Sequence, residues 1–256
     1  MKQVIQFVTR FFPRHYMQRF AIFFLRVLGL FYRGNRYTDP ISGKSYRKLL
    51  PYGRQVSRKN ALAPDSASLE RHRVIWLFLE SETNFFKQPI RFLHVAPEYC
   101  FLKKFKKQQN LDYVSADLIS PWADVKLDVR AMPFENNCFD AAMCNHVFEH
   151  IDDDKLAMSE FYRVLKPGGW AIFQVPIKWG QPTIEDPTVT SPQEREKLFG
   201  QRDHVRYYGH DYPTRLAEIG FQVDVVDYAQ KIGNERVTKY ALLPDEKIIF
   251  CQKPLK

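Results

Sequence analysis

From Ile90 to its C-terminal end, the chain alternates short apolar runs with amphipathic stretches. This alternation is typical of β-α units wound around a mostly parallel sheet. Strands are expected at 91–96, 112–117, 125–129, 141–145, 169–176, 221–228 and 247–252, and helices at 99–107, 153–165 and 212–219. The pattern therefore predicts an α/β fold with a seven-stranded, mostly parallel sheet and helices on both faces.

Composition separates the chain into three expected regions. Residues 1–37 form a basic aromatic amphipathic segment, which we expect to be a helical extension preceding the sheet. Residues 38–89 combine an irregular stretch rich in Pro, Gly, Ser and Lys with a helix over 69–86 that covers the core. In that helix, His72 stands between Arg71 and Arg73, which indicates a solvated face. Residues 90–256 form the sheet domain.

The charge of the chain is unevenly distributed. The 256 residues carry a net charge of +9, and residues 1–37 contain seven basic residues and no acidic one. The remainder has a net charge of only +2, so the sheet domain gives little support for a nucleic-acid groove, and we expect no nucleic-acid partner. The four cysteines lie far apart without metal-site or disulfide spacing, which predicts reduced thiols in a cytoplasmic protein.

The N-terminal segment fits neither a cleavable signal peptide nor a membrane span of ~20 residues, because basic residues interrupt its apolar stretch. If 16–33 is helical, Arg19, Arg26 and Arg33 form one narrow stripe on an otherwise apolar surface. Such a helix can lie in a membrane interface while its arginines reach anionic headgroups. Packing on the protein itself or on a second subunit fits the sequence equally well. The expected localisation is cytoplasmic, either free or peripheral on the inner face of the membrane.

Residues at the ends of the expected strands indicate a ligand site, because open α/β sheets bind ligands beyond the carboxyl ends of their strands. The first strand ends in the run His94-Val95-Ala96-Pro97-Glu98, and the second ends at Asp117, 19 residues past Glu98. An acid at this distance is placed to accept the two hydroxyls of a ribose. Asp128-Val129 and Asn145-His146 follow the third and fourth strands, and one ligand fits all four positions.

The strongest local signature joins Phe139-Asp140, Glu149-His150-Ile151 and the run Arg-Val-Leu-Lys-Pro-Gly-Gly over 163–169. Pro-Gly-Gly is expected to end a helix and turn the chain into the fifth strand. At these residues, and over roughly 91–253, the chain resembles the class I S-adenosylmethionine-dependent methyltransferases of small-molecule type. At 60–62, 69–73, 94–98 and 203–206 it is also similar to a subgroup of undefined substrate. The resemblance implies a Rossmann-like sheet and S-adenosyl-L-methionine as cofactor.

The resemblance also implies roles for the residues at the strand ends. Asp117 would accept the ribose hydroxyls, Asp128 and the backbone of Val129 would meet the adenine, and Asn145 would face the methionine moiety. The full set of expected cofactor-binding residues is His94, Ala96, Glu98, Asp117, Leu118, Asp128, Val129 and Asn145.

Two departures from the family pattern change this expectation locally. Ala96-Pro97-Glu98 stands where Gly-x-Gly is usual, and His94 replaces the common acid. S-adenosylmethionine has no pyrophosphate that must approach the backbone, so the loss is tolerable here and argues against NAD. Glu98 is then available for the ammonium group or the sulfonium. The second departure concerns 38–66, where similar sequences carry two cysteine pairs suggestive of a zinc ribbon. Asp39, Ser42, Ala63 and Ser66 lie in this stretch instead, which excludes a cysteine-ligated metal.

Methyl transfer is an in-line displacement, in which alignment does most of the work and a base is needed only for a protonated acceptor. We expect His146 as that base and His204 as a second catalytic residue. His204 lies in the long segment 177–209, which is expected to cover the acceptor pocket. No metal is expected. An open alternative is a metal held along one helical face by His146, Glu149 and His150, with His204 as a fourth ligand. This spacing is similar to the E-x-x-E-H arrangement of certain magnesium-assisted O-methyltransferases.

The sequence thus predicts an S-adenosylmethionine-dependent methyltransferase that acts on a small-molecule or lipid-linked acceptor, at O or N. For the segment 1–37, association with a membrane surface and packing on the protein or on a second subunit are equal alternatives. The contrasting hypothesis is a cofactor-binding or scaffold protein that keeps the fold without turnover. The sequence leaves the acceptor, the methylated atom and the oligomeric state undetermined.

Overall fold

The computed structural model describes residues 14–53 and 56–255. The contacts of the chain divide it into two compact units that interleave along the sequence. We call them the N-terminal unit (1–83, 99–104 and 228–246) and the sheet unit (84–98, 105–227 and 247–256). These two units interleave along the chain, whereas the three regions expected from composition are consecutive segments. The boundaries of those three regions therefore stay predictions.

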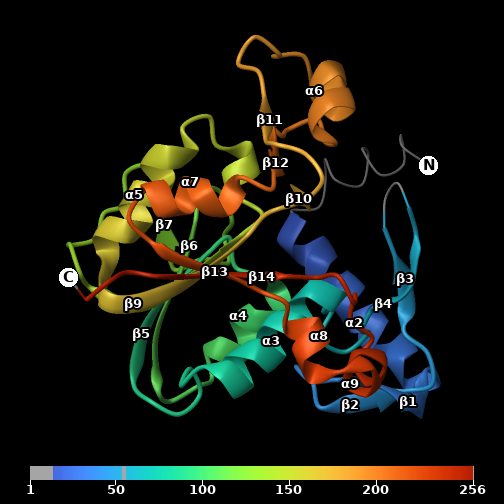
Figure 1. Cartoon of the computed structure of the whole chain (residues 1–256). Coiled ribbons are helices and arrows are strands. Elements are labelled where there is room, and N and C mark those ends of the chain that lie inside the picture. The colour runs from blue at the N-terminus through green and yellow to red at the C-terminus, as the bar shows by residue number, and fades with distance from the viewer. Residues whose placement is uncertain (1–13, 54–55, 256) are drawn as a thin grey trace. The chain divides into compact units, whose positions relative to one another are not determined.

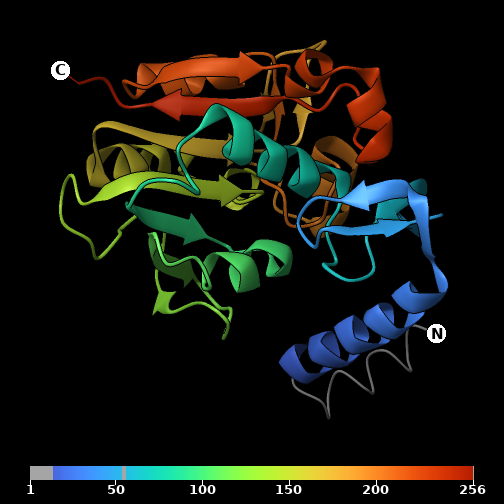
Figure 2. The ribbon, with the colours of Figure 1, turned by 90° about the horizontal axis from the view of Figure 1, so that it is seen from below.

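A seven-stranded sheet forms the centre of the sheet unit, and Figure 2 shows its strands side by side. Every neighbouring pair is parallel except those of β14, which is antiparallel to β9 and to β13. The strand order is β13-β14-β9-β8-β5-β6-β7. The strands are β5 (Ile90–Val95), β6 (Leu111–Asp117), β7 (Val125–Lys126), β8 (Phe139–Asn145), β9 (Leu165–Gln174), β13 (Gln222–Val226) and β14 (Ile248–Gln252). The expected seven-stranded, mostly parallel, Rossmann-like sheet is confirmed.

The strand order reverses at β5, where the chain adds β6 on one side and later β8 on the other. His94 pairs with Ser115 of β6 and with Met143 of β8. Because the three strands are parallel, their carboxyl ends meet at one edge of the sheet, where such folds bind ligands. This edge carries the residues that follow Val95, Asp117 and Asn145.

Helices α5 (Asp154–Val164) and α7 (Tyr212–Glu218) cover one face of the sheet (Figure 1). Helix α5 begins where Asp153 Oδ1 accepts the Leu156 N–H at 2.9 Å, and its buried residues join one core with alternate residues of β5. Residues on the other side of β5 belong to an aromatic cluster, in which the rings of Phe85 and Phe92 lie 4.8 Å apart. Because successive side chains of β5 point to opposite faces of the sheet, Leu93 and Val95 belong to the core under α5, whereas Phe92 and His94 lie on the opposite face.

At Pro-Gly-Gly, the structure differs locally from the expected turn between a helix and a strand. Strand β9 already begins at Leu165, directly after α5, and includes Gly168 at a φ of 79° and Gly169. A Cβ on Gly169 would lie 2.8 Å from the Lys166 carbonyl oxygen and 3.0 Å from that of Asp140. The glycines therefore allow β9 to bulge against β8 rather than end a helix, as the register shift between Phe139 and Ala141 shows.

The long segment after β9 folds into a small element of its own. Strand β12 (Arg206–Gly209) lies between β10 (Ile177–Lys178), which is parallel to it, and β11 (Ile184–Glu185), which is antiparallel. Helix α6 (Pro192–Phe199) starts at the N-cap Ser191 and ends at Gly200, which has a φ of 86°. The chain before β12 is thereby directed back toward the short 3₁₀ helix η1 (Phe148–His150).

The stretch 38–64 of the N-terminal unit is more regular than its composition predicts. Two antiparallel hairpins form, β1 (Arg33–Asp39) with β2 (Lys44–Tyr46) and β3 (Leu50–Tyr52) with β4 (Arg58–Leu62). Turns 39–43 and 63–67 share one backbone pattern, because the fifth residue of each has a positive φ and donates to the carbonyl of the first. Asp39 accepts the N–H groups of Ile41 and Ser42 and the hydroxyl of Ser68. The Asp39 carboxylate and the Ser68 hydroxyl thus link the two turns. Neither turn contains a cysteine.

Helices α2 (Arg14–Phe31), α3 (Glu70–Glu82), α8 (Tyr228–Ile232) and α9 (Asn234–Lys239) complete the N-terminal unit, together with most of α4 (Tyr99–Phe105). The solvated face expected at His72 and Arg73 is wrong, since both side chains are buried. Arg73 donates to the carbonyl oxygens of Ala61, Ser68, Tyr240 and Ala241. A buried guanidinium is tolerated because backbone carbonyls accept its N–H groups. Within the described residues, no helix is long and apolar enough to cross a bilayer.

Candidate active site

A chain of four polar side chains lies at the carboxyl ends of β5 and β8. Tyr113 Oη and His94 Nδ1 are 2.9 Å apart, and His94 Nε2 lies 2.9 Å from Glu98 Oε2. Asn145 Nδ2 donates to Glu98 Oε1 at 2.9 Å. Because an ionised carboxylate only accepts, His94 Nε2 carries a proton and Tyr113 donates to Nδ1. His94 is fully buried with both nitrogens engaged, so it orients Glu98 instead of facing a ligand itself.

Asn145 carries a buried, unpaired hydrogen-bond acceptor at this edge of the sheet, within the described residues. Its side chain is buried, and its Oδ1 has no hydrogen-bonding partner within the described residues. A buried acceptor without a partner costs free energy unless a ligand supplies a donor. The Asn145 Oδ1 and the Glu98 carboxylate therefore suit an ammonium group, which has three donors and no acceptor.

Asp117 closes the turn after β6 and retains one oxygen for a ligand. Its Oδ1 accepts the N–H groups of Ile119 and Ser120, at 2.8 Å and 2.7 Å. These bonds fix the carboxylate at the strand end and leave Oδ2 for a ribose hydroxyl. The adjacent Leu118 and Ile119 are exposed, an apolar surface suited to cover by an adenine ring.

Asp128 and Val129 follow β7, which is shorter than the expected strand 125–129. The Asp128 carboxylate is bound by Arg130, whose Nη2 lies 2.7 Å from Oδ2, and these hydrogen bonds hold the pKa of Asp128 below its usual value. A ligand amino group would have to share this carboxylate with Arg130. The Val129 side chain packs in the core, so only its backbone is available to a ligand.

Ala96 occupies a backbone position that favours glycine. Its φ is 50°, a left-handed conformation that costs a residue with a Cβ roughly 1 kcal/mol. Ala96→Gly is therefore expected to raise the free energy of unfolding by about 1 kcal/mol, measured by chemical denaturation. The matched change Ala157→Gly, inside α5, should lower it by at least about 1 kcal/mol. A loss of stability in Ala96→Gly would show that this φ is not under strain.

The expected catalytic residue His146 adjoins Asn145 and also has a positive φ, of 56°. Its N–H donates to the carbonyl of Gln174 in β9 at 2.7 Å, which fixes the turn after β8. The ring Nδ1 lies 3.2 Å from Glu149 Oε1, and the buried Nε2 has no partner in the described part of the chain. Since the carboxylate accepts, Nδ1 carries the proton and Nε2 retains a lone pair.

His204, the second expected catalytic residue, lies beside η1 through the return of the chain before β12. Val205 N–H donates to the Glu149 carbonyl at 2.9 Å, and the rings of His150 and His204 are edge to face with centroids 4.8 Å apart. Burial lowers the pKa of His204, which favours its neutral form at pH 7. His146 therefore contacts the Glu149 side chain from the turn after β8. The segment that carries His204 contacts the Glu149 backbone from the other side, through Val205.

Sequence reasoning missed two residues of this arrangement. Tyr113 orients His94 from the neighbouring strand, and its place on the same sheet face follows from the period of two along β6. Arg206 was expected only as a polar group of the covering segment. Its guanidinium instead donates to the carbonyl oxygens of Phe148, Ile151 and Asp152. No local pattern signals such a contact, because its acceptors are backbone atoms more than fifty residues away.

Comparison with known proteins finds a match to a family over part of the chain. Residues 92–173 match the family described as "Methyltransferase domain". An uncharacterised 37.1 kDa protein in transposon TN4556 of Streptomyces fradiae is 35% identical over 68 residues, 26% of this chain and 19% of that protein. The aligned part thus spans only about a fifth of that relative's length.

Two solved structures are similar to this chain. The [4+2]-cyclase SpnF is 16% identical, with a TM-score of 0.50, over 74% of this chain and 85% of that one. The 1,6-didemethyltoxoflavin-N1-methyltransferase of Burkholderia thailandensis, solved with S-adenosylhomocysteine, is 13% identical with a TM-score of 0.46, over 72% of this chain and 78% of the other.

Residues 92–173 therefore match a methyltransferase domain on a Rossmann-like sheet, which supports S-adenosylmethionine as its cofactor. The residues present fit that cofactor. Asn145 Oδ1 and Glu98 would hold the ammonium of its methionine moiety, and Asp117 Oδ2 would hold the ribose. These three side chains follow β8, β5 and β6, at one edge of the sheet.

Proposed function

We propose that the chain transfers the methyl group of S-adenosylmethionine to an oxygen or nitrogen atom of a small or lipid-linked acceptor. The observation that carries this proposal is the buried Nε2 of His146, which lacks a partner in the described chain and adjoins the cofactor residue Asn145. When bound, S-adenosylmethionine supplies a methyl group already activated on a sulfonium. His146 Nε2 would accept the proton of an O–H or N–H acceptor, and Glu149 would hold the ring through Nδ1.

The test is untargeted mass spectrometry of cell extract incubated with the protein and methyl-labelled S-adenosylmethionine. We expect at least one extract compound to gain a labelled methyl group. His146→Ala should lower turnover at least about 100-fold, the usual contribution of a general base, and His204→Ala should also lower it well beyond its effect on cofactor affinity. The exposed His210 provides a matched control, His210→Ala, which should change neither quantity.

Two results would count against these roles. Equal losses of turnover and cofactor affinity would make His146 a binding or structural residue. Cofactor binding without any labelled product across extracts would favour a binding or scaffold protein instead.

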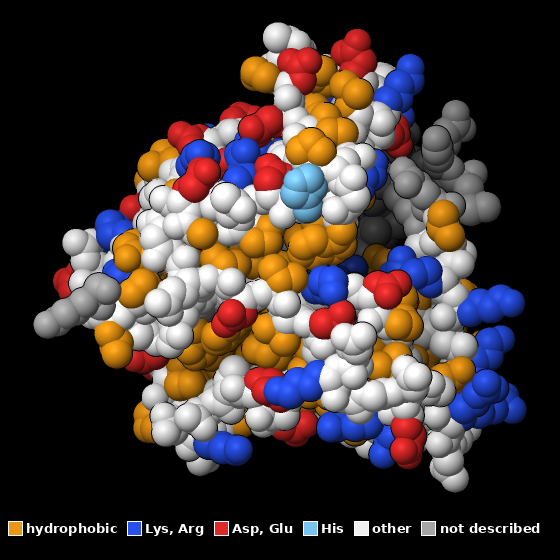
Figure 3. Space-filling model, in the orientation of Figure 1, with side chains coloured by type: hydrophobic (Ala, Val, Ile, Leu, Met, Phe, Trp, Pro, Cys, Tyr) orange, Lys and Arg blue, Asp and Glu red, His pale blue; other side chains and the backbone are white. Residues whose placement is uncertain are grey.

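We further propose that the N-terminal unit binds an anionic membrane surface. From Phe20 to Phe31, one face of α2 is exposed and carries large apolar side chains at helical spacing: Phe20, Phe23, Phe24, Val27, Leu30 and Phe31. Basic side chains gather over β1–β4 of the same unit (Figure 3), where Arg36, Lys48 and Lys59 are exposed. An apolar helix face beside basic groups is the pattern of an interfacial anchor.

The expected arginine stripe does not support this proposal. Arg26 donates to the Asp65 carbonyl and Arg33 pairs with the Asp65 carboxylate at 3.3 Å, so both are bound within the unit. The side chain of Arg19 lies outside the described residues. Attraction to headgroups would come from the exposed basic residues of the hairpins instead.

Co-sedimentation with vesicles tests the anchor. Because Phe23 and Leu30 are mostly exposed, Phe23→Ser with Leu30→Ser should remove about 2–4 kcal/mol of apolar transfer, about 30- to 1,000-fold in partitioning. Leu198→Ser, at an exposed leucine of α6, is the matched control and should partition like the wild type. Equal partitioning of the double variant, or a stable dimer that the double variant abolishes, would overturn the proposal in favour of a protein partner for this face.

A further inference from the structure

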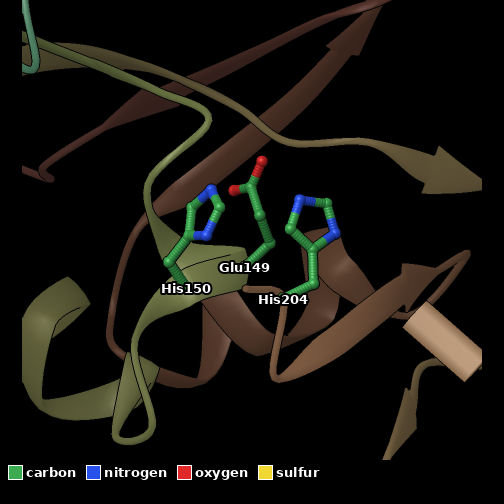
Figure 4. A group of neighbouring side chains, drawn as sticks. All are labelled: Glu149, His150 and His204. Carbon is green, nitrogen blue, oxygen red and sulfur yellow. The ribbon is translucent and has the colours of Figure 1, made fainter. Parts of the chain in front are cut away.

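A compact group of potential ligands forms where η1 meets the chain before β12. Figure 4 shows Glu149, His150 and His204 with their side chains pointing toward one another. One ligand atom of each residue lies within 4.8 Å of those of the other two. Glu149 and His150 belong to η1, whereas His204 precedes β12, so only the tertiary structure creates the group.

Two members of the group are buried without compensation. Glu149 and His204 are 2% and 3% exposed, and Glu149 Oε2 and His204 Nε2 have no hydrogen-bonding partner among residues 14–53 and 56–255. A carboxylate oxygen and an imidazole nitrogen in this state each cost free energy. A cation between them would compensate both, because each atom presents a lone pair.

The outer nitrogens of the two histidines are held by backbone carbonyls. His204 Nδ1 lies 3.0 Å from the Phe199 oxygen, and His150 Nδ1 lies 3.1 Å from the Asp203 oxygen. A carbonyl oxygen only accepts, so each Nδ1 carries the proton and each Nε2 keeps its lone pair in the neutral ring. Histidines that ligate metals are oriented by this kind of second hydrogen bond.

The two segments are fixed independently of the cluster. Val205 N–H donates to the Glu149 carbonyl, and Arg206 donates to the carbonyls of Phe148 and Asp152. On the other side, Glu149 Oε1 is engaged by His146. Glu149 Oε2 and the His204 ring are thus preorganised by contacts that do not involve each other.

We propose that Glu149, His150 and His204 bind one divalent transition-metal ion of the zinc type. Two imidazoles and one carboxylate suit Zn²⁺ or Co²⁺, whereas Mg²⁺ prefers oxygen ligands. Three protein ligands leave a coordination position for an oxygen atom from outside, as in catalytic zinc sites. His146 lies outside this group and contacts Glu149 instead, so the ligand set differs from one along a single helical face.

The metal site does not rest on the proposed methyl transfer, because metal binding is measured without an acceptor. The full chain would be treated with a chelator, freed of it, and titrated with ZnCl₂ by calorimetry and with CoCl₂ by visible absorption. We expect one Zn²⁺ per chain and the d–d bands of low-coordinate Co²⁺. Glu149→Gln and His204→Ala should each weaken Zn²⁺ binding at least about 100-fold.

Controls separate loss of ligands from loss of fold. His210→Ala should bind Zn²⁺ like the wild type, and each variant should retain S-adenosylmethionine binding. His150→Ala, at a side chain that is 32% exposed, provides a variant that removes a ligand without opening the core. Wild-type Zn²⁺ affinity in all three ligand variants would overturn the proposal. So would a Zn²⁺ stoichiometry other than one per chain, or a chain that binds Mg²⁺ in a titration with MgCl₂ but does not bind Zn²⁺.

Discussion

Arg206→Met should lower the free energy of unfolding by about 3–5 kcal/mol, the loss typical of removing one partner from a buried ionic cluster. The Arg206 guanidinium is buried, donates to one carbonyl in η1 and two just after it, and binds Glu185 at 2.9 Å. A methionine of similar length would remove these donors, and the Phe148 carbonyl would keep only the Ile151 N–H. Denaturation followed by far-UV circular dichroism measures the change.

Arg206→Lys separates charge from geometry at this position. A lysine keeps the positive charge but lacks the planar fork that reaches several acceptors, so we expect an intermediate loss. Arg202→Met is the matched control, because the Arg202–Glu196 pair is exposed and such pairs contribute about 0–1 kcal/mol. Similar losses in Arg202→Met and Arg206→Met would contradict the role of Arg206 as the link between β12 and η1.

Asp117→Ala is expected to weaken S-adenosylmethionine binding by about 1.5–3 kcal/mol, roughly 10- to 150-fold, the loss of a charge-assisted hydrogen bond. Oδ1 of Asp117 is held by two backbone N–H groups, so Oδ2 is the oxygen proposed to accept a ribose hydroxyl. Calorimetry with the purified chain measures the affinity directly.

Asp112→Ala provides the control, because Asp112 lies in the same strand and pairs with Arg91 at an exposed site. It should bind the cofactor like the wild type. Asp117→Asn should retain part of the affinity, since an amide oxygen still accepts a hydroxyl without the charge. Wild-type affinity in Asp117→Ala would remove this residue from the site.

Much of the fold could be predicted from local pattern alone. Apolar runs separated by helical stretches placed all seven strands of the sheet, and Gly220 follows the end of α7 in the left-handed region, with a φ of 116°. The strand-end position of Asp117 could be predicted because the period of a strand and the side of its carboxyl end are local properties. The hairpins of 38–64 could not, since their strands are short and their turns are joined by Asp39 and Ser68, 29 residues apart.

The sequence by itself determined the fold class and the edge of the sheet where polar residues gather, because strand ends and periodicity are encoded by neighbouring residues. Its resemblance to a known family implied the cofactor. Only the tertiary structure decided which side chains meet there. The His94 ring lies within hydrogen-bonding distance of Tyr113 and Glu98. His204 lies beside Glu149 and His150, which precede it in the chain by 54 residues or more. Arg73 is buried despite its charge, because distant carbonyls accept its protons. Such contacts depend on backbone groups brought together by folding, and no spacing along the chain encodes them.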